Sequence, residues 1–173
     1  MSTSTEITAA QVMELRARTG AGVMDCRKAL AEAGGDLERA AELLRATGLG
    51  MAEQKAGRAT REGLVDAYIH GNGRLGALVE VSCETDFVAR TEDFRQLARE
   101  LAMQVAATAP RYLSREDVPA AERDNPQVKE LILLEQPYIR DAGRTVQDLI
   151  TETVAKVGEN IQVRRFARFK VGE

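Results

Sequence analysis

The hydrophobic pattern in the first third of the chain predicts three short helices. The first begins at Thr8, whose hydroxyl can cap a helix, and ends at Gly20. Apolar residues then recur every three or four positions over residues 23–35 and 36–48, and glycines close both segments. We therefore predict a compact three-helix module over residues 1–48.

Residues 49–62 lack the apolar stripe of a packed helix. They are polar and basic, so we predict a partly helical linker and place the domain boundary there. The basic residues of this linker are Lys55, Arg58 and Arg61. Residues 63–173 then form the predicted core domain.

The core domain is predicted to begin with a β-hairpin. Residues 64–70 and 75–83 have the composition of strands, and Gly71-Asn72-Gly73 between them is a turn sequence. A helix follows, because apolar residues return at helical spacing at Phe94, Leu97, Ala98, Leu101, Ala102 and Val105. This stripe is wide enough to cover one face of the hairpin.

Regular structure is expected again near the end of the chain, after an irregular segment that begins at Pro110. A cap at Thr145 and a stop at Gly158 predict a helix, and a strand from 161 to 171 can pair with the hairpin. Its alternation predicts one face with Ile161, Val163, Ala167 and Phe169, and another with Gln162, Arg164, Arg168 and Lys170. The predicted fold class is α+β, with a three-stranded antiparallel sheet packed on helices.

Composition and charge argue against several classes of protein. The 173 residues carry a net charge of −3 from 27 acidic and 24 basic side chains, so no global field attracts nucleic acid or anionic lipid. Met1–Glu6 shows no basic segment before an apolar run, and nowhere do 18 apolar residues follow one another. We expect a cytoplasmic protein that binds neither nucleic acid nor membrane.

The sequence offers little for chemical catalysis. His70 is the single histidine, and Cys26 and Cys83 show neither metal-ligand spacing nor a disulfide framework. A phosphate-binding glycine loop is also missing. A dyad of Cys83 and His70 would need close contact, but the predicted hairpin separates them by roughly 30 Å at about 3.3 Å per residue. We predict no enzyme, no cofactor and no metal.

Three segments allow two interpretations each. Residues 164–169 interleave arginine and phenylalanine as an RNA-stacking strand does, or they form a sheet edge with a solvated basic face. The glycine-rich loop 18–24 is a tight turn with Met24 in the core, or a surface on which Met24 adapts to a partner. In segment 84–88, Phe87 closes the core or is offered to a partner.

Two segments resemble the signatures of the elongation factor Ts family. The first is Val12–Leu30, which reads VMELRARTGAGVMDCRKAL, and the second is Cys83–Arg90, which reads CETDFVAR. The resemblance continues in Lys156–Ile161 and covers nearly the whole chain. It implies a ubiquitin-associated-like three-helix module joined to a core domain with an antiparallel sheet.

The resemblance further implies a guanine nucleotide exchange factor that binds elongation factor Tu, both GDP-bound and nucleotide-free. On the module it implies partner contacts at Arg16, Val23, Met24 and Arg27. In the core it implies contacts at Thr85, Asp86, Phe87 and Val88, with Asp86 and Phe87 intruding beside the partner's magnesium site. His70 matches a histidine that contacts the phosphate-binding loop of the partner.

A homodimer is also implied, because the chain holds one core repeat where long members of the family hold two. The segment from Ala121 to Leu133 is shorter than is usual in the family. Exchange itself requires no catalytic group. An exchange factor need only bind a state of the GTPase that holds magnesium and phosphate weakly, and the exchange factor and the nucleotide then weaken each other's binding by the same factor. The alternative function is a ubiquitin-associated-like interaction module fused to an RNA-binding α+β domain.

Overall fold

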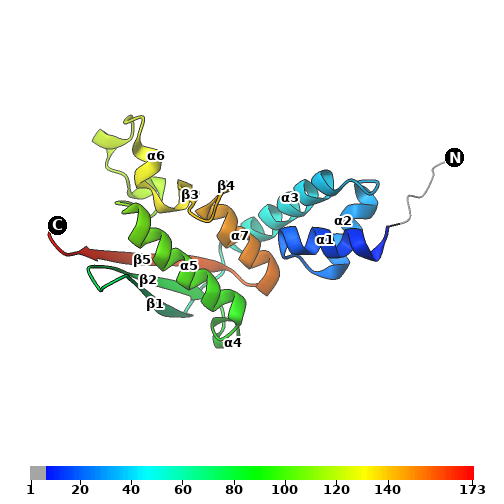
Figure 1. The fold of residues 1–173 in the computed structure, drawn as a ribbon, viewed down its shortest axis with the longest axis horizontal. Helices are drawn as coiled ribbons and strands as arrows, with labels where there is room; N and C mark the ends of the chain where they lie inside the picture. Colours follow the sequence, from blue (N-terminus) through cyan, green and yellow to red (C-terminus); the bar gives the residue numbers. More distant parts are fainter. Residues whose placement is uncertain (1–6) are drawn as a thin grey trace.

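The computed structural model describes residues 7–173 as an N-terminal three-helix module beside an α+β core (Figure 1). The helices of the module are α1 (Ala9–Thr19), α2 (Val23–Glu32) and α3 (Leu37–Lys55). Thr8 and Gln11 form the capping box of α1, Gly20 ends α1 with a φ of 67°, and Asp36 caps α3. The three predicted helices and the residues that begin them are therefore confirmed.

Helix α3 is longer than the sequence predicts. The prediction ends it at Gly48, but the helix continues to Lys55 through the first half of the predicted linker. Gly48 is buried against α7 (Val146–Val157), and a Cβ there would lie 3.7 Å from the Cβ of Ala155 and 3.9 Å from Cγ2 of Thr151. The glycine thus permits close packing of two helices and does not stop one.

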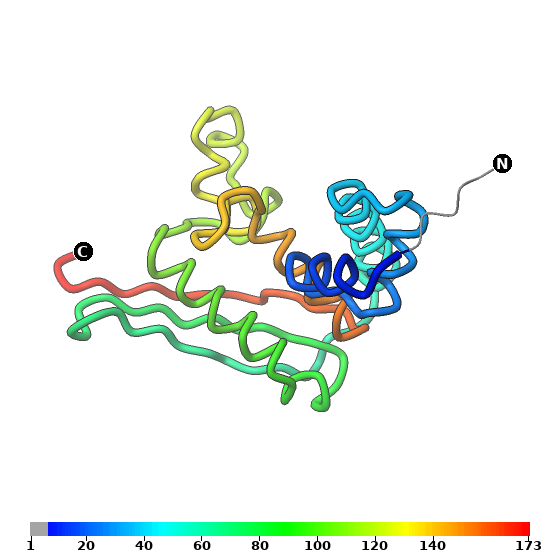
Figure 2. Tube along the Cα trace, turned by 45° about the vertical axis from the view of Figure 1, so that its right-hand side comes forward, coloured from blue at the N-terminus to red at the C-terminus, as the bar shows by residue number. Residues whose placement is uncertain are grey.

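As predicted, the core contains a three-stranded antiparallel sheet, and its strand order is β1-β2-β5. The strands are β1 (Glu62–His70), β2 (Leu75–Cys83) and β5 (Ile161–Lys170). In the hairpin His70 pairs with Leu75, and Glu62 pairs with Cys83 at the other end. Helix α5 (Glu92–Thr108) lies across one face of the sheet (Figure 2), and its predicted apolar stripe is buried there.

The last strand does not keep the alternation that the sequence predicts. A β-bulge at Arg164 shifts the register, so that Val163 pairs with Val81 while Arg165 pairs with Glu80. Beyond the bulge Phe166 packs against the core and Phe169 is 68% exposed. The prediction that Ala167 and Phe169 share the core face with Ile161 and Val163 is therefore wrong, because one extra residue exchanges the two faces of the strand.

Residues 110–136, here called the α6 lobe, are more ordered than predicted. Their elements are η1 (Arg115–Asp117), η2 (Ala120–Glu122), α6 (Val128–Leu131) and η3 (Leu133–Glu135). Val118, Val128 and Ile132 form a small separate core in this lobe, with Tyr112 packed against it. The expectation of mostly loop is therefore only partly right, since short turns carry a local apolar cluster.

The chain returns from the α6 lobe to the core through a small second sheet. Its strands are β3 (Pro137–Tyr138) and β4 (Asp141–Thr145). Thr145 and Asp148 then form the capping box of α7, and Gly158 ends that helix in a left-handed conformation, as predicted. None of the helices within residues 7–173 is both long and apolar enough to cross a membrane.

Candidate functional site

An exposed phenylalanine marks one end of the sheet. Phe87 is 78% exposed, more than any other large apolar residue that the structure describes. It stands on α4 (Asp86–Ala89), a single helical turn between β2 and α5, while Val88 and Ala89 of the same turn are buried in the core. The interpretation in which Phe87 closes the core is therefore wrong. Val88, which the resemblance counts among the partner contacts, is buried beneath Phe87 instead. The turn Asp86–Ala89 with its exposed phenylalanine is here called the tip.

The tip is held by its N-terminal side. The hydroxyl of Thr85 accepts a hydrogen bond from the amide of Val88 at 3.4 Å, which caps α4. The carboxylate of Asp86 forms an ion pair with Arg90 at 2.8 Å. Both Asp86 and Thr85 are half-buried. Phe87 is thus presented by a turn whose neighbouring residues are fixed to the protein.

His70 and Cys83 lie at opposite ends of the hairpin and form no pair. The phenol of Tyr68 lies 3.0 Å from Nδ1 of His70, which is exposed at the hairpin turn. Burial, reinforced by the negative charge of Glu159, raises the pKa of the Cys83 thiol to about 11. A buried, protonated thiol is a poor nucleophile, so this cysteine has a structural role.

The loop between α1 and α2 exposes apolar residues in the module. Met24 is 72% exposed and Val23 is also exposed, while Cys26 and Leu30 on the inner face of α2 are buried. The interpretation that places Met24 in the core is therefore wrong. Arg27, one turn after Val23, is exposed, as is Arg16 on α1. The predicted contact residues of the module are thus all accessible.

Comparison with known proteins shows the family of the chain. A family model described as "Elongation factor TS" matches residues 31–128. An elongation factor Ts from Thermoanaerobacter sp. (strain X514) is 53% identical, and the alignment covers 96% of each chain. The relative from Moorella thermoacetica is 54% identical over 96% of both chains. The chain belongs to the elongation factor Ts family. It is thus related to proteins of translation elongation.

These elongation factor Ts relatives have additional residues. The relative from Carboxydothermus hydrogenoformans is 50% identical over 96% of this chain and 90% of its own length. Each of the three alignments spans 195 positions, whereas this chain has 173 residues. The relatives therefore carry residues opposite gaps in this chain.

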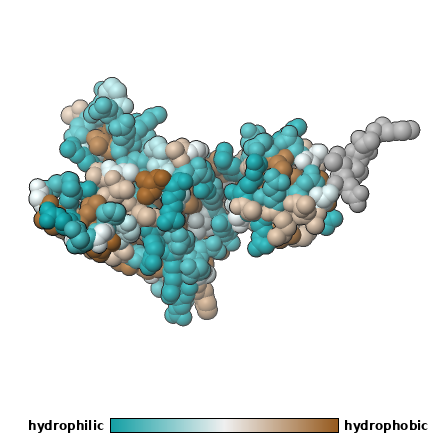
Figure 3. All heavy atoms as spheres, in the orientation of Figure 1, coloured by the Kyte–Doolittle hydropathy of each residue, from teal (hydrophilic) through white to brown (hydrophobic). Residues whose placement is uncertain are grey.

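The face of the sheet that points away from α5 is apolar and uncovered. Figure 3 shows apolar residues along the lower left edge of this view, where the sheet lies in Figure 1. The residues of this open face are Val65, Ala67, Ile69, Leu78, Ala167 and Phe169. Cδ1 of Ile69 leans over Gly76, which leaves room for it. The sequence signals this open face, because β1 has apolar residues on both of its faces.

The arginines of β5 are engaged within the chain. Arg164 donates to the backbone oxygen of Thr60 at 2.7 Å and to Oγ of Ser82 at 2.9 Å. Arg165 pairs with Glu80 at 2.6 Å. Arg168 donates to the backbone oxygen of Ala106 at 3.0 Å and pairs with Glu173 at 2.7 Å. These bonds weaken the interpretation of β5 as a strand for RNA stacking.

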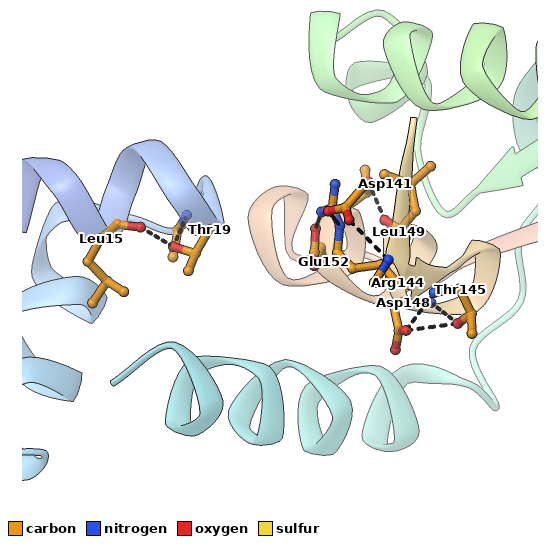
Figure 4. A network of polar contacts seen from close by, with 11 residues as sticks. Leu15, Thr19, Asp141, Arg144, Thr145, Asp148, Leu149 and Glu152 are labelled. Carbon is orange, nitrogen blue, oxygen red and sulfur yellow. Dashed lines mark hydrogen bonds and ion pairs between the residues drawn. The ribbon is translucent and has the colours of Figure 1, made fainter. Parts of the chain in front are cut away.

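A cleft of about 590 Å³ separates the module from α7 and β4. Figure 4 shows Thr19, bonded to the backbone of Leu15, on one side and a polar cluster on the other. In that cluster Arg144 pairs with both Asp141 and Glu152. Burial raises the pKa of Glu152, whereas Arg144 lowers it in part. The charged groups of this cluster therefore pair with one another.

No cluster of three or more potential metal-ligating side chains occurs within residues 7–173. One residue that sequence reasoning did not single out is Glu159, whose carboxylate contacts the base of the tip. Glu159 lies in Lys156–Ile161, the third segment that resembles the family, but it is 74 positions away from Thr85, whose hydroxyl it binds. No local pattern could reveal that contact.

Proposed function

We propose that this protein is a guanine nucleotide exchange factor for elongation factor Tu. The observation that carries the proposal is the exposure of Phe87 on a turn whose neighbours Val88 and Ala89 are buried. A large aromatic side chain in water gains nothing for folding, but it can supply much of the binding free energy at an interface. Membership of the elongation factor Ts family supports the choice of partner.

In the proposed mechanism Phe87 acts as a wedge and Asp86 as a charged group beside it. Phe87 inserts between structural elements of the partner near its magnesium and phosphate site. The carboxylate of Asp86, now paired with Arg90, disturbs the magnesium side. A GTPase state bound in this way holds nucleotide poorly, and nucleotide and exchange factor weaken each other's binding by the same factor. No covalent step occurs.

The module docks on the partner in this proposal and does not expel nucleotide by itself. Val23 and Met24 form an exposed apolar pair at the start of α2, and methionine adapts well to an irregular surface. Arg27 adds positive charge one helical turn after Val23, and Arg16 is exposed on α1. Such an apolar centre with a charged rim is typical of a protein interface.

We also propose that two copies assemble through the open faces of their sheets. His70 and Phe87 lie near opposite ends of the sheet, so one chain would struggle to offer both to one GTPase. The open face is apolar at its centre and carries the Arg165–Glu80 pair, whose opposite charges suit a symmetric contact. Two such sheets can pack face to face at about 10 Å.

The deciding experiment measures release of a fluorescent GDP analogue from elongation factor Tu. Phe87→Ala should reduce stimulated release more than tenfold, which corresponds to a hot-spot loss of at least about 2 kcal/mol. Asp86→Ala should reduce it as well. Ile139→Ala, at an exposed apolar residue between β3 and β4, is the control and should leave release unchanged. Normal release by Phe87→Ala would refute the wedge.

Binding to a panel of RNAs, measured with the same preparations, distinguishes the proposed exchange function from the alternative, an RNA-binding protein. An exchange factor should bind elongation factor Tu·GDP and show no preference among the RNAs. Tight RNA binding without any effect on GDP release would favour the RNA-binding interpretation of β5.

A further inference from the structure

The turn between α7 and β5 grips the base of the tip. Oε2 of Glu159 accepts hydrogen bonds from the backbone amides of Glu84 at 3.1 Å and Thr85 at 3.0 Å. Oε1 of the same carboxylate accepts the hydroxyl proton of Thr85 at 2.6 Å. In return Oε1 of Glu84 accepts from the amide of Asn160 at 2.7 Å. The two turns are therefore joined by reciprocal bonds, four in all.

The hydroxyl of Thr85 connects this grip to α4. It donates its proton to Glu159 and accepts from the amide of Val88, so the carboxylate orients the oxygen that caps the turn. A helix of four residues is too short to be stable by itself. Hydrogen bonds to a charged carboxylate are among the stronger ones in proteins. The orientation of α4 therefore depends on groups outside the helix. Among them, Glu159 makes the most hydrogen bonds to Glu84 and Thr85, the two residues just before the tip.

The same node reaches the end of α3. The side-chain amide of Asn160, which is buried, donates to the backbone oxygens of Ala56 at 3.2 Å and Arg58 at 2.9 Å. The guanidinium of Arg58 lies 3.5 Å from the carboxylate of Glu84. The base of the tip, the α7–β5 turn and the segment after the module thus meet at one place.

We propose that Glu159 is the positioning residue of the exchange tip, which holds Thr85 so that α4 presents Asp86 and Phe87 in a single orientation. This inference rests on the proposed function for its consequence in exchange. Its physical content, the ordering of the tip in the free protein, is independent of any partner. If the carboxylate of Glu159 only joined the sheet to α7, its removal would leave the mobility of residue 87 unchanged.

The absence of tryptophan from the sequence makes a direct test possible. Phe87→Trp places a single indole at an exposed position, and its fluorescence anisotropy reports the mobility of the tip. Adding Glu159→Ala should lower that anisotropy clearly. Glu159→Gln retains one acceptor oxygen and should give an intermediate value, which amounts to partial rescue.

The matched control is Asp117→Ala, added to the same Phe87→Trp variant. The carboxylate of Asp117 accepts from the backbone amide and from the hydroxyl of Ser114, both at 2.9 Å, in the α6 lobe away from α4. This control removes a similar set of bonds and should leave the anisotropy of the indole unchanged. An equal fall in both double variants, or no fall with Glu159→Ala, overturns the proposal.

Exchange kinetics supply the second readout, in proteins that keep Phe87. With Glu159→Ala the maximal rate of GDP release should fall about tenfold or more, while the half-saturating concentration changes less, because the module still docks. If Glu159→Ala fails to fold, Glu159→Gln decides by the same two measurements. Normal exchange by Phe87→Ala would refute the proposed function, whereas the anisotropy would still report whether Glu159 orders the tip.

Discussion

Phe87 and Phe94 lie on consecutive helical segments, yet the first is 78% exposed and the second is fully buried. Thr85 caps the segment that holds Phe87, and Thr91 caps the helix that holds Phe94. The same side chain therefore has two tasks within one short stretch: Phe94 fills the core under α5, and Phe87 faces solvent.

This contrast predicts opposite effects of truncation on stability. Phe94→Ala should lower the free energy of unfolding by about 3–5 kcal/mol, since it leaves a cavity in the core. Phe87→Ala should change it by less than about 0.5 kcal/mol, as is usual at exposed sites. Urea unfolding of both variants beside wild type makes the comparison. A strongly destabilised Phe87→Ala would show that this side chain is buried in solution.

Met24→Asp should fold normally and bind elongation factor Tu more weakly. The exposed position of Met24 tolerates a charge in the free protein, whereas the proposed apolar contact would bury that charge without a partner. We expect a loss of affinity of at least about tenfold, equal to about 1.4 kcal/mol. Titration calorimetry with elongation factor Tu·GDP measures it, and the thermal midpoint serves as the folding control. If the variant were unfolded, Met24 would have to be a core residue in solution.

Leu78→Lys should convert the proposed dimer to a monomer. Leu78 is 44% exposed at the centre of the open sheet face, where a second copy would bury the new ammonium group. Leu49, on α3 and 42% exposed, offers a matched control outside that face. Light scattering at micromolar concentration should give the mass of two chains for wild type and Leu49→Lys. A monomeric wild-type protein with full exchange activity would contradict the assembly.

Two glycines predict opposite effects of the same substitution. Gly48→Ala should raise the free energy of unfolding by about 0.5–1 kcal/mol, because the new methyl group meets α7 at ordinary contact distance and alanine favours the helix. Gly63 has a φ of 148°, and a Cβ there would overlap the carbonyl oxygen of Val81 and lie 2.7 Å from the Cα of Ser82. Gly63→Ala should therefore cost about 2 kcal/mol or more in the same unfolding experiment.

Alkaline pH should destabilise the fold through Cys83. Its pKa rises from an ordinary 9.0 to about 11 in the folded chain, chiefly by burial. The unfolded chain therefore loses this proton at lower pH than the folded chain does, and stability falls as pH rises from about 9 towards 11. The free energy of unfolding of Cys83→Ala should fall less than that of wild type between pH 8 and pH 10.5, roughly a window of 2.5 units. Parallel curves for the two proteins would show that another group titrates.

Local signals in the sequence predicted most of the helix boundaries. The capping boxes at Thr8 and Thr145 and the stops at Gly20 and Gly158 depend on residues within four positions of one another. Their chemistry is therefore visible without the fold. The hairpin turn at 71–73 belongs to the same class, and the two strands meet at it with His70 opposite Leu75.

Features that depend on distant residues could not be predicted in this way. The local sequence around Gly48 indicates the end of a helix, and only the packing of α7 against it shows why a glycine stands there. The exposure of Phe87 depends on which neighbours enter the core, and a periodic pattern cannot tell the two cases apart. Glu159 acts on Thr85 across 74 positions. The resemblance to the family located the tip, but not the residue that holds it.

The bulge at Arg164 makes β5 sensitive to its length. A chain that lacked this one residue would have to turn either Val163 or Phe166 away from the core, and one buried apolar side chain contributes about 1.5–3 kcal/mol. If Phe166 turned away, the open face would change as well, because Phe169 would move to the other side of the sheet. Single-residue deletions within this strand should therefore be tolerated far less often than substitutions at its exposed positions.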